Sequence, residues 1–232
     1  MTNPADGFLW YLAFLFSVVV HEASHAFTAM KLGDRTAYEG GQVTLDPMPH
    51  IKREPIGTVV VPILSYLAGG WMIGWASAPY DPVWARNYPH RSAMMALAGP
   101  LANLLVMVAA GLAIRLGMAL DWFYAPDSIN LSRIVAARQD GTMVGVAALL
   151  SILFSLNALL FTFNLIPLPP LDGSGIIPFF LNRGKAVAYM DMIRGSHMSF
   201  FGIFVAWKAF DYIFHPVHLL FIQLLYPGMG YH

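Results

Sequence analysis

The sequence contains no cysteine and few charged residues, and both absences narrow what the protein can be. Without cysteine, disulfide bonds, cysteine-ligated zinc and thiol catalysis are excluded. Only 11% of the residues are charged, against about 25% in soluble domains, so a soluble globule would lack the charge to cover its surface. Lys and Arg (13) balance Asp and Glu (13), so the basic excess of a nucleic-acid binder is missing too. We therefore expect no nucleic-acid partner.

Apolar sequence is what the chain has in abundance. Hydrophobic residues make up 57% of its 232 residues, and the mean hydropathy is +0.59. A helix needs about 20 largely apolar residues to cross a lipid bilayer. Four stretches meet this requirement: Phe8–Met30, Ser92–Leu116, Thr142–Leu165 and Met198–Tyr226. The pattern predicts an all-α polytopic membrane protein with four to five transmembrane helices, forming a single membrane-embedded domain over residues 1–232.

The motif His21-Glu22-Ala23-Ser24-His25 lies in the last third of the first apolar stretch. Histidines four residues apart share one face of a helix, so both imidazoles can reach one zinc ion. Glu22 is offset by about 100° and can approach water at that zinc without being a ligand. Ionisable groups at membrane depth are costly, which indicates either a function or a polar cluster satisfied by other helices.

Asp172 is the best candidate for the third protein ligand that a catalytic zinc site requires. It follows the third strong apolar stretch, after three prolines within residues 167–170 that break the helix. Gly173 lets the backbone turn sharply. Broken backbone at membrane depth is tolerated where it is buried in protein or lines a cavity, so this segment is suited to aim a carboxylate inward. The alternative is an ordinary loop with a solvated aspartate.

Taken together, these motifs resemble those of the site-2 protease family of intramembrane zinc metalloproteases. The resemblance is carried by HExxH at His21–His25 and by NxxPxxxxDG at Asn164–Gly173. Residues 98–103 (AGPLAN) also resemble that family's middle core helix. We find no PDZ insertion between the motifs and no appended regulatory domain, so the expectation is a minimal form of the family.

The resemblance implies a role for each matching residue. His21, His25 and Asp172 would hold one zinc ion, Glu22 would be the catalytic base, and Asn164 would contact the substrate. The implied function is an intramembrane zinc endopeptidase, in which Glu22 activates zinc-bound water. Its partners would be membrane-anchored or single-pass proteins, cut within or near the bilayer.

Two other functions remain open from the sequence. One is a membrane metal-ion carrier that uses the same histidine and aspartate cluster. The other is a catalytically silent relative that acts only as a binding partner in the membrane. A carrier needs ligands but has no use for a non-ligand base beside the metal, so the role of Glu22 discriminates between the first alternative and a peptidase.

A fifth apolar stretch, Ile56–Ala78, is interrupted by a proline and a glycine pair. His25 lies near the C-terminal end of its helix, and Asp172 lies just past the end of its own. Both helices must therefore run in the same direction if these side chains are to meet. A full crossing by Ile56–Ala78 would oppose the two directions, so we predict that the segment at about 56–78 is broken or re-entrant.

The distribution of basic residues favours the same topology, because cytoplasmic loops carry an excess of Lys and Arg. A re-entrant fifth stretch puts nine basic residues on the side of the zinc site and three on the other side. A full crossing puts seven basic residues on the inner side of the membrane and five on the outer side. The nine are Lys31, Arg35, Lys52, Arg53, Arg86, Arg91, Arg183, Lys185 and Arg194, and the three are Arg115, Arg133 and Arg138. We therefore expect an integral protein of the plasma membrane with its active site toward the cytoplasm.

One further segment has a possible link to substrate. Gln42–Leu45 follows a glycine pair and has strand character. A helical substrate must be locally extended to be cut, and a strand edge could hold it by strand addition. The alternative is an ordinary loop hairpin.

Overall fold

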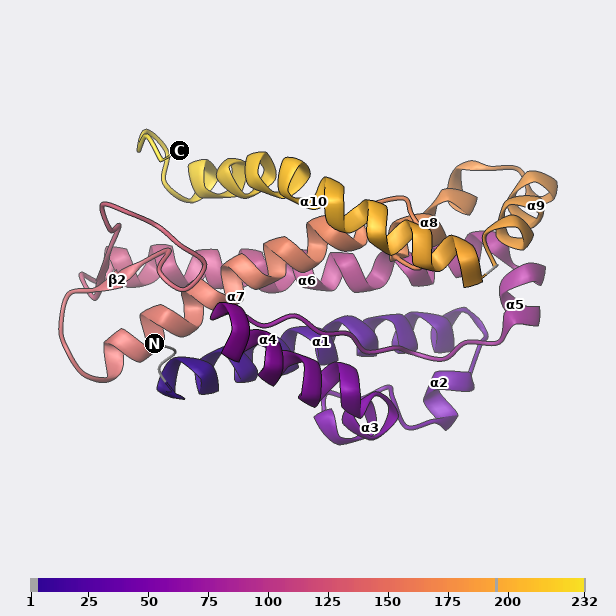
Figure 1. The fold of residues 1–232 in the computed structure, drawn as a ribbon, viewed down its shortest axis with the longest axis horizontal. Helices are drawn as coiled ribbons and strands as arrows, with labels where there is room; N and C mark the ends of the chain where they lie inside the picture. Colours follow the sequence, from indigo (N-terminus) through magenta and orange to yellow (C-terminus); the bar gives the residue numbers. More distant parts are fainter. Residues whose placement is uncertain (1–3, 195, 232) are drawn as a thin grey trace.

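Three long helices form the centre of the molecule: α1 (Pro4–Leu32), α6 (Pro89–Ala119) and α7 (Thr142–Asn164) (Figure 1). The structure is a computed structural model that describes residues 4–194 and 196–231. Within those ranges, these three helices are long and apolar enough to cross a membrane. The predicted all-α membrane architecture is therefore confirmed.

The fourth predicted stretch forms α10 (Ser196–Leu225), which packs against α7. It contains Pro216, and its described residues give two shorter apolar stretches, Phe201–Phe210 and Tyr212–Leu225. Between α6 and α7, β1 (Phe123–Tyr124) pairs antiparallel with β2 (Ala136–Ala137). This hairpin and both chain termini lie at the left in Figure 1, whereas α5 (Pro82–Asn87) and α9 (Arg183–Ile193) lie at the right.

Short helices connect α1 to α6. They are α2 (Thr36–Glu39), α3 (Pro47–Arg53), the π-helix η1 (Ile56–Val60), α4 (Val61–Gly69) and α5 (Pro82–Asn87). Asp46 and Asp81 cap α3 and α5, because each carboxylate accepts a hydrogen bond from the first turn of its helix. Both helices then begin with proline, which suits the first helical turn because its missing N–H has no partner there.

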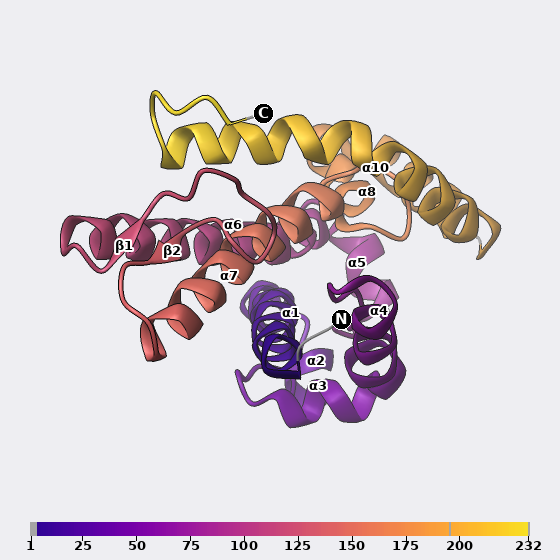
Figure 2. The same cartoon turned by 60° about the vertical axis from the view of Figure 1, so that its left-hand side comes forward.

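The segment at 56–78 turns back, as the directional argument predicts. α4 packs beside α1, as Figure 2 also shows. α4 ends at Gly69 and is followed by the C-cap residue Gly70, whose φ of 75° favours glycine. The chain then returns in extended form, and the N–H of Trp75 donates to the carbonyl of Gly57 at 3.1 Å. We call residues 72–80 the return arm. Ser77 Oγ donates to Glu54 Oε1 at 2.7 Å, which ties this arm to a residue that lies just before the segment.

A second set of short helices follows α7: α8 (Asp172–Ile176), the 3-10 helix η2 (Ile177–Phe180) and α9 (Arg183–Ile193). α8 packs against α6. A Cβ on Gly173 would overlap the carbonyl oxygens of Leu165 and Ile166. Glycine is therefore required here for a close approach between α8 and the end of α7, which is a different reason from the sharp turn that the sequence suggested.

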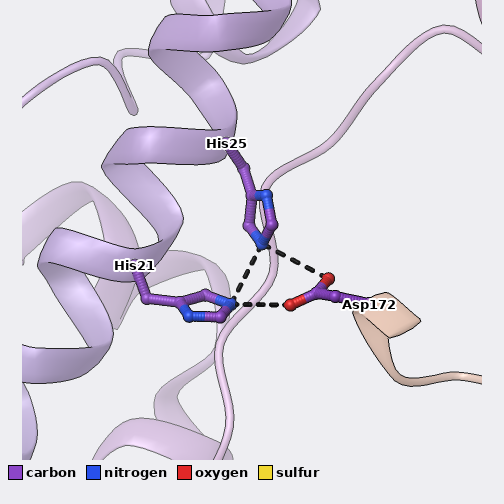
Figure 3. Close-up of side chains that lie close together, drawn as sticks. All are labelled: His21, His25 and Asp172. Atoms are coloured by element: carbon purple, nitrogen blue, oxygen red, sulfur yellow. Dashed lines mark hydrogen bonds and ion pairs between the residues drawn. The ribbon is translucent and has the colours of Figure 1, made fainter. Parts of the chain in front are cut away.

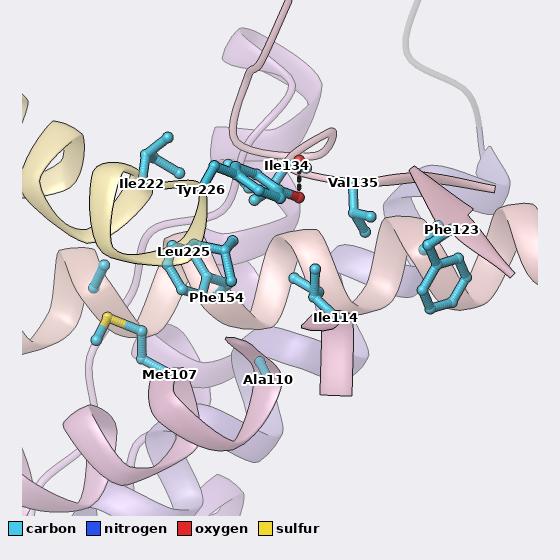
Figure 4. Packing of buried hydrophobic residues seen from close by; sticks show 12 residues of the cluster. Met107, Ala110, Ile114, Phe123, Ile134, Val135, Phe154, Ile222, Leu225 and Tyr226 are labelled. Atoms are coloured by element: carbon cyan, nitrogen blue, oxygen red, sulfur yellow. Dashed lines mark hydrogen bonds between the residues drawn. The ribbon is translucent and has the colours of Figure 1, made fainter. Parts of the chain in front are cut away.

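The largest apolar cluster lies toward the end that carries the β-hairpin (Figure 4). α6 contributes Ile114, α7 contributes Phe154, and the end of α10 contributes Ile222. Tyr226 packs into the same cluster, and its hydroxyl donates to the carbonyl of Ile134 at 2.9 Å. This cluster fastens the far ends of three helices together, away from the HExxH segment.

Candidate metal centre

One face of α1 and the first residue of α8 supply the three candidate ligands. α1 buries both His21 and His25, and their spacing sets one imidazole above the other on the same face. α8 begins at Asp172, directly after the proline-rich break. Figure 3 shows both imidazoles pointing toward the Asp172 carboxylate. The structure thus brings Asp172 to a pair of histidines that lies far from it in the sequence.

The spacing of these ligand atoms suits zinc. His21 Nε2 lies 3.0 Å from Asp172 Oδ2, and His25 Nε2 lies 3.3 Å from Asp172 Oδ1. The two Nε2 atoms are 3.0 Å apart. A tetrahedral zinc ion with bonds of about 2.0 Å separates its ligand atoms by about 3.3 Å. Within the described part of the chain, these three form the one cluster of His and acidic side chains that could hold a metal ion.

Hydrogen bonds on the far side of each ring turn Nε2 toward the cluster. His21 Nδ1 lies 2.6 Å from Asn103 Oδ1, and His25 Nδ1 lies 2.7 Å from the main-chain oxygen of Met95. A carbonyl oxygen only accepts, so His25 donates its Nδ1–H, and in the neutral ring Nε2 keeps the lone pair. Asp172 Oδ2 is buried and receives no hydrogen bond from the described residues. A cation among these atoms would satisfy all of them, so the donor set fits zinc.

The carboxylate of Asp172 is held in its charged form. Burial alone would raise its pKa, but when the imidazoles carry protons instead of a metal, the positive charge at His25 and His21 outweighs burial and holds the Asp172 pKa below its usual range. A metal cation at the same place acts in the same direction. Asp172 is therefore available as an anionic ligand at neutral pH.

Gly99 of α6 makes room for the two imidazoles. A Cβ at this position would overlap the Nε2 atoms of both His21 and His25. Gly99 belongs to the AGPLAN motif, and the structure shows that its contact is with the candidate ligands themselves. α6 can lie this close to the cluster only because the residue is glycine.

Glu22 lies beside the ligands, in the wall of a cavity. Its side chain is buried, and together with His25 and Asp172 it lines a cavity of about 450 Å³. Other walls come from residues 76–80, from the end of α9 and from the start of α10. The polar lining residues include Ser77, Tyr80, Ser92, Ser174, Arg194 and Ser199. The cavity is large and polar enough to hold water beside the candidate ligands.

Asn164 and Gln42–Leu45, which the sequence linked to substrate, lie outside the cavity lining. Asn164 is the last residue of α7, and its Nδ2 donates to the carbonyl of Leu160 in the same helix at 3.0 Å. It is not among the residues that line the cavity. Gln42–Leu45 forms bends and no strand, and Gln42 is buried, with its Nε2 donating to the carbonyl of Ser77 at 3.1 Å.

Sequence reasoning missed the partners of the two histidine rings and the walls of the cavity. The contact with Asn103 could have been suspected, because Asn103 closes the AGPLAN motif. The contact with the Met95 carbonyl has no signal in the sequence, since any residue carries that oxygen. The arm at residues 76–80 also gave no signal, because its role depends on how the preceding helix turns back.

The family model of Peptidase family M50 matches residues 9–195. The chain is 30% identical to "Putative zinc metalloprotease YwhC" of Bacillus subtilis over 182 residues, covering 74% of this chain and 73% of that protein. It is 28% identical over 171 residues to "Putative zinc metalloprotease Rip2" of Mycolicibacterium smegmatis, and 33% identical over 159 residues to the Mycobacterium tuberculosis protein of the same name.

The extent of these matches differs. The match covers 72% of this chain and 55% of the M. smegmatis protein, and 68% of this chain and 52% of the M. tuberculosis protein. This chain therefore spans about half the length of the two Rip2 proteins. No solved structure matches it significantly. The matched range, residues 9–195, includes the HExxH segment and Asp172.

Proposed function

The chain belongs to Peptidase family M50, the site-2 protease family of membrane zinc metalloproteases, and from this premise we propose that it cuts membrane-anchored or single-pass proteins within or beside the bilayer. One observation carries the proposal. Two imidazoles and the Asp172 carboxylate converge within 3.3 Å of one another, and a buried glutamate lines the same cavity without belonging to the ligand cluster.

The reaction needs a nucleophilic water and relief of the charge that develops on the scissile carbonyl. His21, His25 and Asp172 would hold zinc, whose Lewis acidity would lower the pKa of water and polarise a carbonyl oxygen. Glu22 takes a proton from the attacking water and then delivers it to the leaving nitrogen, so the proton balance closes on one side chain. The hydrogen bonds from Nδ1 keep both imidazoles oriented during these steps.

The position of Glu22 favours a peptidase over a metal carrier. Among the described residues, the potential ligand atoms that lie within 4.8 Å of one another belong to His21, His25 and Asp172. Glu22 is buried at the edge of that group and faces the cavity that a substrate would enter. A carrier has no use for a base in this position, whereas hydrolysis requires one.

The return arm gives an extended peptide something to pair with. Ala76, Ser77 and Ala78 line the cavity, and their main-chain N–H groups have no hydrogen-bond partner among the described residues. Successive N–H groups of an extended chain face opposite sides, so a substrate strand could accept hydrogen bonds either from Ala76 and Ala78 or from Ser77, as in recognition by strand addition. We therefore propose the arm, and not Gln42–Leu45, as the edge that binds substrate. Contact between Asn164 and substrate stays a prediction from the family resemblance.

The orientation in the membrane is part of the proposal. The topology that lets the candidate ligands meet puts nine basic residues on the side of the zinc site and three on the other. An excess of Lys and Arg marks the cytoplasmic side. We therefore expect a plasma-membrane protein whose cavity opens toward the cytoplasm, with a single zinc ion per chain.

The test compares wild type with Glu22→Gln, and uses Glu39→Gln as a matched control. Glu39 lies on α2, and its side chain is exposed. Each purified protein is assayed for bound zinc and for cleavage of a model transmembrane substrate. Zinc should be retained in all three, and Glu22→Gln should lose activity by about 100-fold or more, while Glu39→Gln keeps it.

Two other results would count against the proposal. Equal cleavage by wild type and Glu22→Gln would remove Glu22 from the mechanism. Zinc bound in wild type without cleavage of any tested membrane substrate would favour the silent relative.

A further inference from the structure

Three polar side chains with no exposed surface lie directly behind His21. Ser17, Asn103 and Asn157 are each 0% exposed, and they come from α1, α6 and α7 respectively. Polar groups buried this deeply are costly unless their donors and acceptors are paired. In this cluster the donors and acceptors are paired, and the donor and acceptor of each hydrogen bond can be assigned.

Main-chain carbonyl oxygens set that direction, because they accept hydrogen bonds and cannot donate. Ser17 Oγ donates to the carbonyl of Ala13 at 2.6 Å. Asn157 Nδ2 donates to the carbonyl of Leu153 and to Ser17 Oγ, both at 2.8 Å. The amide oxygen of Asn157 is therefore turned toward α6, where Asn103 Nδ2 donates to it at 2.8 Å.

The same logic continues to the histidine. Asn103 Nδ2 also donates to the carbonyl of Ser17 at 3.3 Å, so both of its hydrogens are used and its Oδ1 faces His21 Nδ1 at 2.6 Å. That oxygen can only accept, so His21 donates Nδ1–H and the neutral ring keeps its Nε2 lone pair for the metal.

We propose that Asn103 is a positioning residue for zinc, which fixes the tautomer and ring orientation of His21 and thereby sets the affinity of the site. Asn157 and Ser17 act through Asn103, because they hold its amide in the required orientation. The inference rests on the proposed function only through the zinc ion. It does not depend on which peptide is cut or on whether Glu22 is the base.

A purely structural role is the competing explanation, since polar side chains also join helices to one another in lipid. Ser151 provides a matched control for that role. It is 0% exposed on α7, its Oγ accepts from the N–H groups of Ile134 and Val135 at 2.9 and 3.2 Å, and it donates to the carbonyl of Ala147 at 2.7 Å. None of these hydrogen bonds involves either histidine.

The experiment uses the full chain in detergent and compares wild type, Asn103→Leu, Asn103→Asp and Ser151→Ala. Zinc affinity is measured on folded protein by competition with a chelator, and the visible spectrum of the Co²⁺-substituted protein reports the ligand geometry. Asn103→Leu should bind zinc about 10- to 100-fold more weakly and change the Co²⁺ spectrum. Asn103→Asp keeps an acceptor for Nδ1–H but loses both donors of the amide, so it should bind zinc more tightly than Asn103→Leu and more weakly than wild type. Ser151→Ala should unfold at a lower temperature with unchanged zinc affinity.

Other outcomes overturn the inference. It fails if folded Asn103→Leu binds zinc as wild type does, if Asn103→Asp is as weak as Asn103→Leu, or if Ser151→Ala weakens zinc equally. If Asn103→Leu does not fold, Ser17→Ala replaces it, because it removes only one hydroxyl that holds Asn157. A loss of several-fold in zinc affinity then supports the inference, and no loss contradicts it. Zinc affinity is read without substrate, so failure here is distinct from failure to cleave.

Discussion

The two ends of the helical centre bury different kinds of side chain. Near the metal cluster, α1, α6 and α7 bury serine, asparagine and histidine side chains joined by directed hydrogen bonds. Toward the β-hairpin, α6 and α7 bury side chains such as Ile114 and Phe154 among other apolar residues. At the first end, helix contact depends on hydrogen-bond direction and on a missing Cβ, whereas at the second it depends on volume. Substitutions near the metal cluster should therefore reduce zinc binding, whereas substitutions toward the β-hairpin should reduce stability.

Gly99→Ala should produce the largest effect. The added methyl group would overlap Nε2 of both His21 and His25, and a misplacement of about 1 Å at a reacting centre can cost about 100-fold in rate. We expect the loss of bound zinc, measured by metal analysis, and a loss of activity of about 100-fold or more, measured by substrate cleavage.

The matched control for Gly99→Ala is Gly145→Ala in α7. No atom lies within 4 Å of the Cβ that would be added there. Alanine is favoured over glycine in a helix by roughly 0.5–1 kcal/mol, so this variant should keep zinc and activity and be slightly more stable. A Gly99→Ala protein with normal zinc content would contradict the described approach of α6 to the ligands.

Phe154→Ala should show the opposite pattern. Its side chain is 3% exposed in the apolar cluster, and removing a buried Phe side chain costs about 3 kcal/mol or more. Denaturation in detergent should reveal this loss, while the zinc content of the folded fraction stays unchanged. Leu112→Ala is the control, because Leu112 lies on α6 with 66% exposure and should cost far less. Loss of zinc from folded Phe154→Ala would show that the two ends are not separable.

Tyr226→Phe should produce the smallest effect. It removes only the hydroxyl that donates to the Ile134 carbonyl and keeps the ring in the apolar cluster. A neutral hydrogen bond contributes about 1 kcal/mol, so the unfolding midpoint should fall slightly at unchanged cleavage rate. A lower cleavage rate at unchanged stability would mean that Tyr226 takes part in the reaction. That result would contradict the distinction between the apolar end and the metal-cluster end.

Local periodicity made much of the metal centre predictable. The spacing of His21 and His25 puts them on one helical face wherever that helix lies, and the prolines before Asp172 end the preceding helix irrespective of its neighbours. The return of the segment at 56–78 followed from the requirement that these side chains meet. Each of these inferences depends on residues within one segment or on the direction of a helix.

The remaining features depend on how helices are rotated against one another, which sequence periodicity does not fix. The hydrogen bonds of Asn103 and the approach of Gly99 require one particular face of α6 to meet α1. Strand character at Gln42–Leu45 was overridden because Gln42 is buried and pairs with the carbonyl of Ser77. The extended segment lies instead at the return arm, where alanine, serine and proline give no strand pattern.

The most direct test of the central claim is X-ray absorption at the zinc edge of the purified wild-type protein. The account predicts one zinc ion per chain, with scattering from two imidazole rings and from oxygen at about 2.0 Å. These signals would match ligation by His21, His25 and Asp172. A stoichiometric zinc ion without imidazole scattering, or a protein that binds no zinc, would contradict it.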